Sequence, residues 1–296
     1  MAKFSFLPPV GVTVGDYDNY KYNLVAIHIR YFRSAFDSFM KPGTKYITIL
    51  RDPATQFESA FVAFEYWKSL PRKQQIVPMR ERLEYFFLNP DYNREKFKQV
   101  VWPLTNRLGT GWYYAKNDQI FDLGLDHKYH DNKSTVKQYI NRLDDELDLV
   151  LILEHIDESL VILRKVLCWS WNDILYMAKN ARAHVEPLSH TLAGKIREWN
   201  SVDVLLYSYF NQTLWNKIAN YGSSLSFQSD LELFRKMLKQ VNEQCESSTS
   251  PYKGKLIQNV AKGASTDCKR LATGNYKMLK DIIHRQSQGR QRPRRI

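Results

Sequence analysis

Two short apolar runs constrain the fold of this 296-residue chain more than any other feature. They are YITIL at 46–50 and LVLIL at 149–153. Both are almost continuously hydrophobic instead of alternating with polar residues, a pattern typical of strands that are covered on both faces. A third run, YNLVAIHI at 22–29, is expected to form another strand. The three runs predict a central, mostly parallel sheet flanked by helices.

Helical spacing follows each of the two constraining runs. Behind the first, Phe57, Phe61 and Phe64 recur at intervals of three or four residues within 56–66, and we expect them to lie in the core. Behind the second, Asp157 is an expected N-cap. Strand-then-helix order in the first half, and mainly helices later, predicts an α/β class with a helix-rich C-terminal half. Further helices are expected at 78–88, 133–146, 171–179, 203–220 and 229–243.

The remaining stretches suggest loops and a tail. Residues 109–131 are expected to form a surface connection, and the Ser-, Gly- and Lys-rich residues 246–275 a loop. The end of the chain is polar and basic without apolar periodicity, so we expect one domain over 1–280 and a flexible basic tail over 281–296.

The net charge of +12 favours an anionic partner. Much of the excess lies in the basic tail, so the rest of the chain is only moderately basic. Basic residues do not interleave with aromatic ones in an RNA-binding pattern, and no helix-turn-helix signature is present. Nucleic acid is therefore not an expected partner, and a basic polyanion-binding protein remains an alternative from another functional class.

Cysteines and sequons give a limited set of expectations. The 3 cysteines have no zinc-type spacing, so no metal is predicted. Cys168 lies in an apolar run and is expected to be buried. Cys245 and Cys268 either form a disulfide in an oxidising compartment or stay reduced. Sequons occur at Asn132 and Asn211, and no run of about 18 apolar residues would span a membrane.

The segment TILRDPATQFESAF at 48–61 carries the most chemical information. A buried strand is expected to end at Arg51, and a helix to begin within a few residues. Ligands of open α/β sheets bind beyond the carboxyl ends of strands, where helix N-termini attract anions. Arg51 offers a bidentate group for phosphate, and Ser59 a hydroxyl donor. The alternative is that Arg51 pairs with Asp52 or another carboxylate and that Ser59 only packs.

This segment resembles the 3′-phosphate-binding element of sulfotransferases that use 3′-phosphoadenylyl sulfate (PAPS). The full string is similar to the form found in galactose 3-O-sulfotransferases. Other blocks resemble that family in the same order, from about residue 20 to about residue 270. They are YNLVAIHIRY at 22–31, FDLGLD at 121–126, LDLVLILEHIDESLVILRKVLCW at 147–169, DILYMAKNAR at 173–182 and FNQTLW at 210–215.

The resemblance implies a P-loop-like sulfotransferase fold, PAPS as co-substrate, and transfer to the 3-hydroxyl of galactose on a glycolipid or glycoprotein. It assigns Arg51 and Ser59 to the 3′-phosphate. His28, at a strand end, is the candidate base that takes the proton of the acceptor hydroxyl, and a histidine satisfied within the strand is its alternative. His155 is the second candidate, and an orienting or capping role is its alternative. Arg182 is a candidate anion contact, or else part of a structural ion pair.

Two further side chains near these candidates have simpler expected roles. Arg30 either lines the site or has a surface or ion-pair role. Glu58 is expected to interact with the dipole of its helix rather than to take part in catalysis.

The family's lysine- and threonine-bearing 5′-phosphosulfate loop and its N-terminal membrane anchor have no counterpart in this sequence. We therefore expect the chain to be N-terminally incomplete, with very low turnover as written. The full-length form is expected in the Golgi lumen as a type II membrane protein, contacting the membrane only through that anchor. A catalytically inactive relative that binds glycan or nucleotide is the alternative within the family.

Overall fold

The computed structural model describes residues 23–26, 29–100, 113–177, 186–252, 255–260 and 263–273, together with 277, 278, 280, 281 and 284. The first half contains α1 (Arg33–Phe39), β1 (Ile47–Leu50), α2 (Pro53–Ala63), α3 (Met79–Phe86), α4 (Pro90–Val100), α5 (Asp118–Asp122) and α6 (Lys133–Glu146). The second half contains β2 (Leu149–Ile152), α7 (Ile156–Val166), α8 (His190–Trp199), α9 (Ser201–Ala219), α10 (Ser224–Cys245), β3 (Glu246–Tyr252), β4 (Lys255–Val260) and α11 (Thr266–Ala272). Short 3-10 helices occupy Tyr66–Ser69, Arg72–Gln74, Tyr113–Ala115, His127–Tyr129, Leu153–His155 and Trp171–Ile174.

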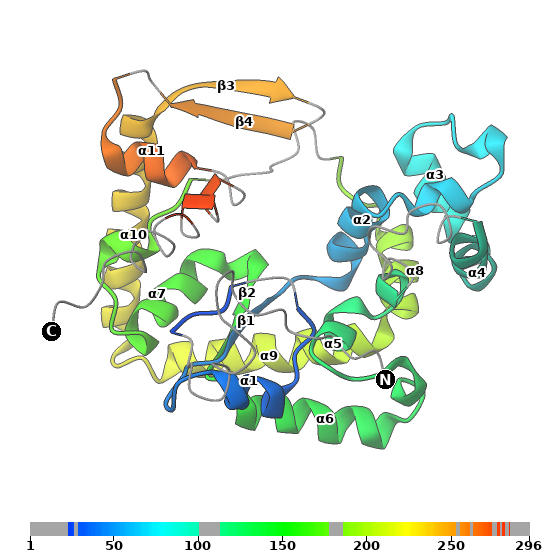
Figure 1. Cartoon of the computed structure of the whole chain (residues 1–296), viewed down its shortest axis with the longest axis horizontal. Helices are drawn as coiled ribbons and strands as arrows, with labels where there is room; N and C mark the ends of the chain where they lie inside the picture. The colour runs from blue at the N-terminus through cyan, green and yellow to red at the C-terminus, as the bar shows by residue number, and fades with distance from the viewer. Residues whose placement is uncertain are drawn as a thin grey trace, which may run out of the picture.

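The two constraining apolar runs form a parallel pair at the centre of the molecule (Figure 1). Their register places Ile47 opposite Leu149 and Leu50 opposite Ile152. All four residues of β2 are buried, whereas Ile49 of β1 is 49% exposed. The prediction of coverage on both faces is thus confirmed for β2 and wrong for part of β1, because β1 borders a cavity described below.

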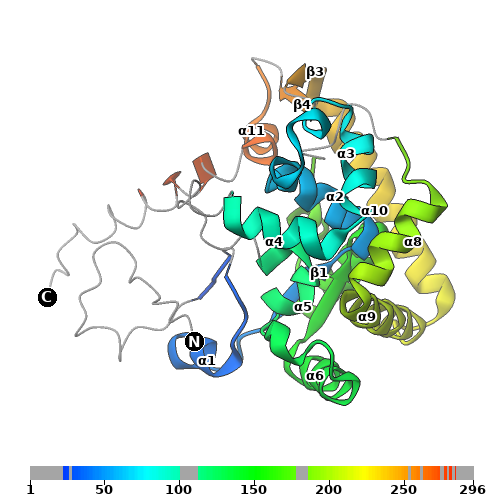
Figure 2. The ribbon, with the colours of Figure 1, turned by 90° about the vertical axis from the view of Figure 1, so that its right-hand side faces the viewer.

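Helices pack around this pair of strands, which confirms the predicted α/β class. α7 and α9 pack against β2, and α6 and α10 pack against α9. The core around the strands includes Leu206 and Phe210 of α9 and Phe234 of α10, each at most 1% exposed. These large apolar side chains fix the strands between helices that are distant in sequence, as Figures 1 and 2 show from two directions.

A second apolar core lies under α2, α3, α4 and α8. Phe57 and Phe61 of α2 are at most 2% exposed, and Tyr66 is fully buried beside them. The Phe57 and Phe61 rings lie 6.3 Å apart between centroids, and Phe86 lies 5.6 Å from each. The expectation that the α2 aromatics form core is therefore confirmed, and this core anchors the helix that follows β1.

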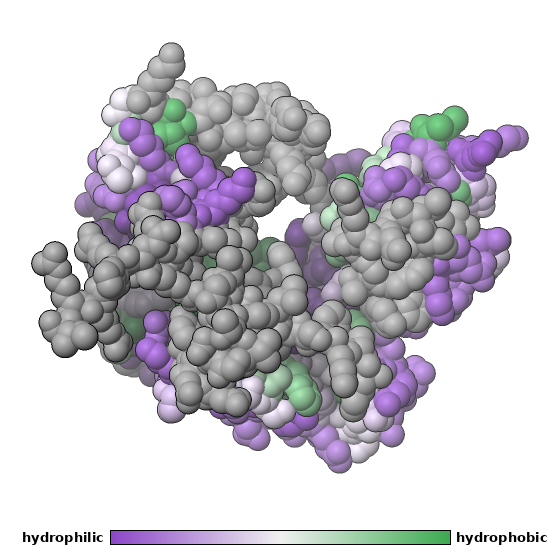
Figure 3. All heavy atoms as spheres, viewed as in Figure 1, coloured by the Kyte–Doolittle hydropathy of each residue, from purple (hydrophilic) through white to green (hydrophobic). Residues whose placement is uncertain are grey.

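The end of the chain differs from the predicted loop. β3 and β4 form an antiparallel hairpin, and α11 follows it. Cys245, the last residue of α10, is joined by a disulfide to Cys268 of α11, and Met177 packs beside both. In the part of the face that Figure 3 colours, the surface near α11 and around α3 is mainly hydrophilic.

Three other predictions from the sequence are wrong in the described residues. Residues 23–26 and 29 form no strand, and the chain after them bonds instead to the end of α5, where the Tyr31 amide donates to Asp122 O at 2.6 Å. Cys168 is exposed, since the chain turns there through a left-handed conformation (φ 52°). The segment 113–131 is no surface connection, because Asn117 and Ile120 are at most 1% exposed.

Helix boundaries also differ in places from those predicted. α6 matches its predicted range of 133–146. Asp157 is not the N-cap of α7, because the helix begins at Ile156, with His155 at the N-cap position and Asp157 in the first turn. In the predicted helix 171–179, the described residues contain only the short 3-10 helix Trp171–Ile174.

Candidate functional site

The junction between β1 and α2 is built around Asp52. Its carboxylate oxygen Oδ1 accepts hydrogen bonds from the Ala54 amide at 3.0 Å and the Thr55 amide at 3.2 Å. Pro53 at the first helical position is preorganised for the helix and has no amide hydrogen to satisfy. The helix therefore starts directly after Asp52, with two residues between the end of β1 and its first residue. The Asp52 carboxylate therefore occupies two of the amides at the start of α2.

Arg51 lies between the end of β1 and this cap, and its side chain is held by α2. Arg51 Nε donates to Thr55 Oγ1 at 2.9 Å. Ser59 is one helical turn further along α2 and half-buried, so Thr55 and Ser59 share a face of the helix. The structure thus puts Arg51, Thr55 and Ser59 along one side of the strand–helix junction. Thr55 was missed from the sequence, although its position four residues after Arg51 was a usable signal.

Two ion pairs lie near the junction. The Asp52 oxygen Oδ2 accepts from Arg197 Nε of α8 at 3.0 Å, so Asp52 pairs with Arg197. Glu58 forms an ion pair with Arg80 of α3 at 3.2 Å, and both side chains are largely buried. The role expected for Glu58, an interaction with the dipole of its own helix, is replaced by this pairing between helices.

The carboxyl end of β2 brings a second set of polar groups to the same edge. Glu154 accepts from the Asp52 amide at 2.9 Å and from the Tyr207 hydroxyl at 3.1 Å. Burial, and then the Glu154 carboxylate, raises the pKa of Tyr207, so this hydroxyl keeps its proton. Glu154 and Tyr207 were missed from the sequence, although Glu154 directly follows the apolar run of β2.

The candidate bases and the remaining arginines lie in different settings. His155 is half-buried, and its ring meets Trp215 of α9 edge-on at 5.0 Å. His28 and Arg182 lie outside the described residues. Arg30 donates to the carbonyl oxygens of Phe121 at 2.8 Å and Gly124 at 2.9 Å, and its guanidinium lies 4.1 Å from the Phe121 ring centroid. Arg30 therefore holds the segment after α5.

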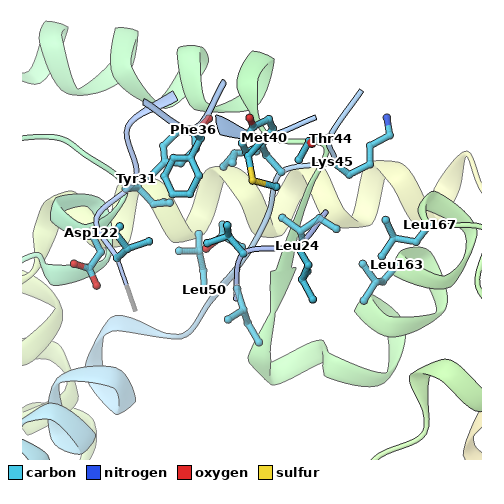
Figure 4. Close-up of a pocket in the computed structure, with 18 of the residues that line it drawn as sticks. Leu24, Tyr31, Phe36, Met40, Thr44, Lys45, Leu50, Asp122, Leu163 and Leu167 are labelled. Atoms are coloured by element: carbon cyan, nitrogen blue, oxygen red, sulfur yellow. The ribbon is translucent and has the colours of Figure 1, made fainter. Parts of the chain in front are cut away.

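A cavity of about 900 Å³ lies along β1 (Figure 4), and Arg51 is one of the residues that line it. Its walls are mainly apolar: Tyr31, Phe36 and Met40 lie on the α1 side and Leu163 and Leu167 on the α7 side. Its polar lining residues next to Arg51 are Gln56, Asp118, Gln119 and Asp122. The cavity therefore joins an apolar wall to a polar end at the strand–helix junction.

Gln119 and two buried carboxyls form the support of that polar end. Gln119 Oε1 accepts from the Arg51 amide at 2.8 Å, and Gln119 Nε2 donates to the Arg51 carbonyl at 2.9 Å. Gln56 donates to Asp118 Oδ2 at 2.6 Å. Burial above all raises the pKa of both Asp118 and Asp203, and that of Asp203 to about 7.

The two sequons lie in different settings. Asn132 is exposed at the start of α6, where its Oδ1 accepts from the Thr135 amide at 3.0 Å. Asn211 is half-buried within α9, and its Oδ1 is buried. Glycan attachment needs an accessible amide nitrogen, so the surroundings of Asn132 suit it better.

Neither a metal site nor a membrane-spanning helix is present among the described residues. No group of three or more His, Cys, Asp or Glu side chains in the described part of the chain is placed to hold a metal ion. Among the same residues, no helix has the length and apolar character needed to cross a membrane.

Comparison with known proteins gives one consistent family. The sequence model described as galactose-3-O-sulfotransferase matches residues 12–259. Galactosylceramide sulfotransferase of Mus musculus is 32% identical over 226 residues, covering 75% of this chain and 48% of the relative. Galactose-3-O-sulfotransferase 3 of Bos taurus is 35% identical over 208 residues, covering 68% and 44%. Galactose-3-O-sulfotransferase 2 of Homo sapiens is 29% identical over 229 residues, covering 76% and 53%.

The chain spans about half the length of the curated relatives it matches. No solved structure matches it.

Proposed function

Because this chain belongs to the galactose-3-O-sulfotransferase family, we propose that it transfers the sulfuryl group of PAPS to the 3-hydroxyl of a galactose residue. The observation that carries the proposal is the alignment of Arg51, Thr55 and Ser59 along one side of the β1–α2 junction. A guanidinium and the Ser59 hydroxyl at the carboxyl end of a parallel strand suit a phosphate monoester, while the Thr55 hydroxyl donates to the Asp52 carbonyl oxygen. Family membership and a site of the required charge thus support the same activity.

In the proposed complex, side chains bind the 3′-phosphate of PAPS. Arg51 supplies the charge and Ser59 a hydroxyl donor, while the first amides of α2 are satisfied by Asp52. Thr55 orients Arg51 through the contact with Nε. Charge-assisted hydrogen bonds of this kind stabilise a bound phosphate by about 2–4 kcal/mol relative to an alanine variant.

The transfer step needs a proton acceptor as well as a held donor. The galactose 3-hydroxyl attacks sulfur, a new O–S bond forms, and the bond from sulfur to the 5′-phosphate oxygen breaks, releasing 3′,5′-ADP. A basic side chain takes the proton that the hydroxyl loses. His28 is the proposed base, and His155 at the carboxyl end of β2 is the second candidate. Arg182 is proposed as a further anion contact.

The wider assignments follow from the same family membership. We propose a P-loop-like sulfotransferase fold, with one domain over 1–280 and a basic tail over 281–296. The proposed acceptor is a galactose-terminated glycolipid or glycoprotein, and the proposed location of the full-length protein is the Golgi lumen, as a type II membrane protein. Glycosylation at Asn132, and at Asn211, is part of this proposal.

A transfer assay tests the activity directly. The purified full-length form is incubated with radiolabelled PAPS and a panel of β-galactosides, and sulfated product is measured. Wild type is expected to sulfate at least one galactoside, and Arg51→Ala to raise the KM for PAPS by about 30-fold to 1,000-fold. Arg142→Ala is the matched control, because Arg142 is exposed on α6 and its contacts with Glu146 and Tyr139 lie within the same helix. The absence of sulfated product with every galactoside would refute the proposal.

The assignment of a base has its own measurement. With an active preparation, His28→Ala and His155→Ala are compared in kcat as a function of pH. If a variant loses the acidic limb of its pH profile and its kcat falls about 100-fold or more, the replaced histidine is the base. A variant that keeps the wild-type profile removes its histidine from that role.

A further inference from the structure

We infer that Gln119 is a positioning residue that fixes Arg51 for recognition of a 3′-phosphate. The inference rests on the proposed function, because it assumes that Arg51 meets that phosphate. It adds a residue from a different part of the chain: Gln119 lies on α5, 68 positions after Arg51.

The contact has the form of a strand pairing. Gln119 Oε1 accepts from the Arg51 amide at 2.8 Å, and Gln119 Nε2 donates to the Arg51 carbonyl at 2.9 Å. The ladder between β1 and β2 ends one residue earlier, at Leu50 opposite Ile152. A neighbouring strand would offer the same acceptor and donor to a residue of β1. The carboxamide of Gln119 therefore extends the hydrogen bonding of β1 to include Arg51.

Gln119 is itself firmly held. Its own amide donates to Asp203 Oδ2 at 3.2 Å, and the Ile120 amide donates to Asp203 Oδ1 at 2.9 Å. Asp203 is 1% exposed in the first turn of α9. The Asn117 carboxamide oxygen accepts from the Val202 amide at 3.1 Å, so α5 and α9 are tied at two adjacent points. The support for Arg51 thus reaches the helix packed under β2.

Arg51 consequently has separate anchors for its backbone and its side chain. Gln119 fixes the backbone, and Thr55 receives Nε. Replacing Gln119 leaves the side-chain anchor intact but releases the peptide groups that set the direction of the side chain. The loss should fall on ligands that carry a 3′-phosphate, whereas a purely structural role would weaken binding of every nucleotide alike.

Calorimetric binding of two nucleotides tests this selectivity in the full chain. The probes are 3′,5′-ADP and 5′-AMP, which differ by the 3′-phosphate. We expect Gln119→Leu to lower the preference for 3′,5′-ADP about tenfold, with 5′-AMP affinity almost unchanged. Gln119→Glu keeps an acceptor for the Arg51 amide but faces its carbonyl with a carboxylate oxygen, so it should lose at least as much. Gln228→Leu is the control, because Gln228 is exposed on α10 and donates to Glu232 of the same helix.

A double-mutant cycle with Arg51→Ala completes the test. If Gln119 acts through Arg51, Gln119→Leu has no further effect on the preference once Arg51 is alanine. If Gln119→Leu keeps the preference for 3′,5′-ADP and Arg51→Ala loses it, the inference about Gln119 is wrong and the proposed function stands. An unchanged preference in Arg51→Ala instead overturns the assignment of Arg51 in the proposed function. Thermal unfolding shows whether Gln119→Leu is folded. If it is not, the nucleotide preference of Gln119→Glu decides the outcome.

Discussion

The buried carboxyls of Asp118 and Asp203 should make stability fall as the pH rises from 5 to 8. Both side chains are buried between α5 and α9, with Asp122 nearby on α5. Burial is the main cause that raises the pKa of both, and the value for Asp203 is about 7. Around Asp118, the Gln56 amide donates to the carboxyl and the Tyr66 hydroxyl lies within its electrostatic reach.

The sign follows from the proton balance. A carboxyl with a raised pKa binds its proton more tightly in the folded state than in the unfolded chain, where the ordinary value of 3.8 applies. Its contribution to stability is complete below pH 3.8 and is lost as the pH rises towards 7. Each pH unit well inside that window costs about 1.4 kcal/mol, and the slope falls to half of this at pH 7, so the interval from pH 5 to pH 7 costs about 2 kcal/mol.

The contributions of other titrating groups to stability can be separated from that of Asp118 and Asp203. The pKa values of Asp37 and Asp148 are lowered, so their stabilisation is lost only in acid below about pH 4, outside the window. Burial lowers the pKa of His130, which costs stability as the pH falls below 6.5 and so acts in the opposite direction. A comparison of two proteins across the window removes the His130 contribution.

The assay is urea unfolding from pH 5 to 8 at constant ionic strength, followed by the fluorescence of the 7 tryptophans. The variant is Asp203→Asn, whose single carboxamide oxygen can still accept from the Ile120 amide, although it loses the bond from the Gln119 amide. Relative to this variant, wild type should lose about 2 kcal/mol between pH 5 and 7. Asp145→Asn, exposed on α6, should follow wild type. Parallel curves for wild type and Asp203→Asn would show that the buried pair does not titrate in this range.

Three further substitutions have effects that urea or thermal unfolding can measure. Replacing Cys245 and Cys268 by serine should cost about 3 kcal/mol, because it removes a link across 23 residues; equal stability with and without reductant in wild type would contradict this. Gly124→Ala should cost more than about 2 kcal/mol, since φ is +106° and the added Cβ would lie 2.5 Å from the Tyr139 hydroxyl; an unchanged melting temperature would be inconsistent with that geometry. Trp199→Phe should cost about 1–3 kcal/mol by leaving a buried carbonyl oxygen without its indole donor, and it fails as a prediction if the urea midpoint is unaltered.

The sequence was sufficient for the elements whose signal is local. The apolar runs at β1 and β2 predicted a parallel pair, and the spacing of Phe57 and Phe61 predicted the buried face of α2. The Arg51–Asp52–Pro53 turn predicted a strand–helix junction, which the cap by Asp52 explains. Each of these sequence signals is carried by residues within about ten positions of one another.

Contacts between segments that are distant in the chain could not be predicted from the sequence in this way. Gln119 lies in a stretch that was expected to be a surface connection, and only the three-dimensional packing places it against Arg51. Glu154 was visible as a carboxylate after a strand, but its pairing with the Asp52 amide depends on the register of two strands about a hundred residues apart. Cys168 is exposed because of a left-handed backbone turn that its apolar neighbours do not reveal.

The bond between Cys245 and Cys268 gives the C-terminal region two covalent paths, one through the backbone and one through sulfur. A protease that cuts the hairpin between them once would leave the two products attached to each other. The cut would become visible on a denaturing gel only after a thiol is added, so integrity of this region has to be judged under reducing conditions.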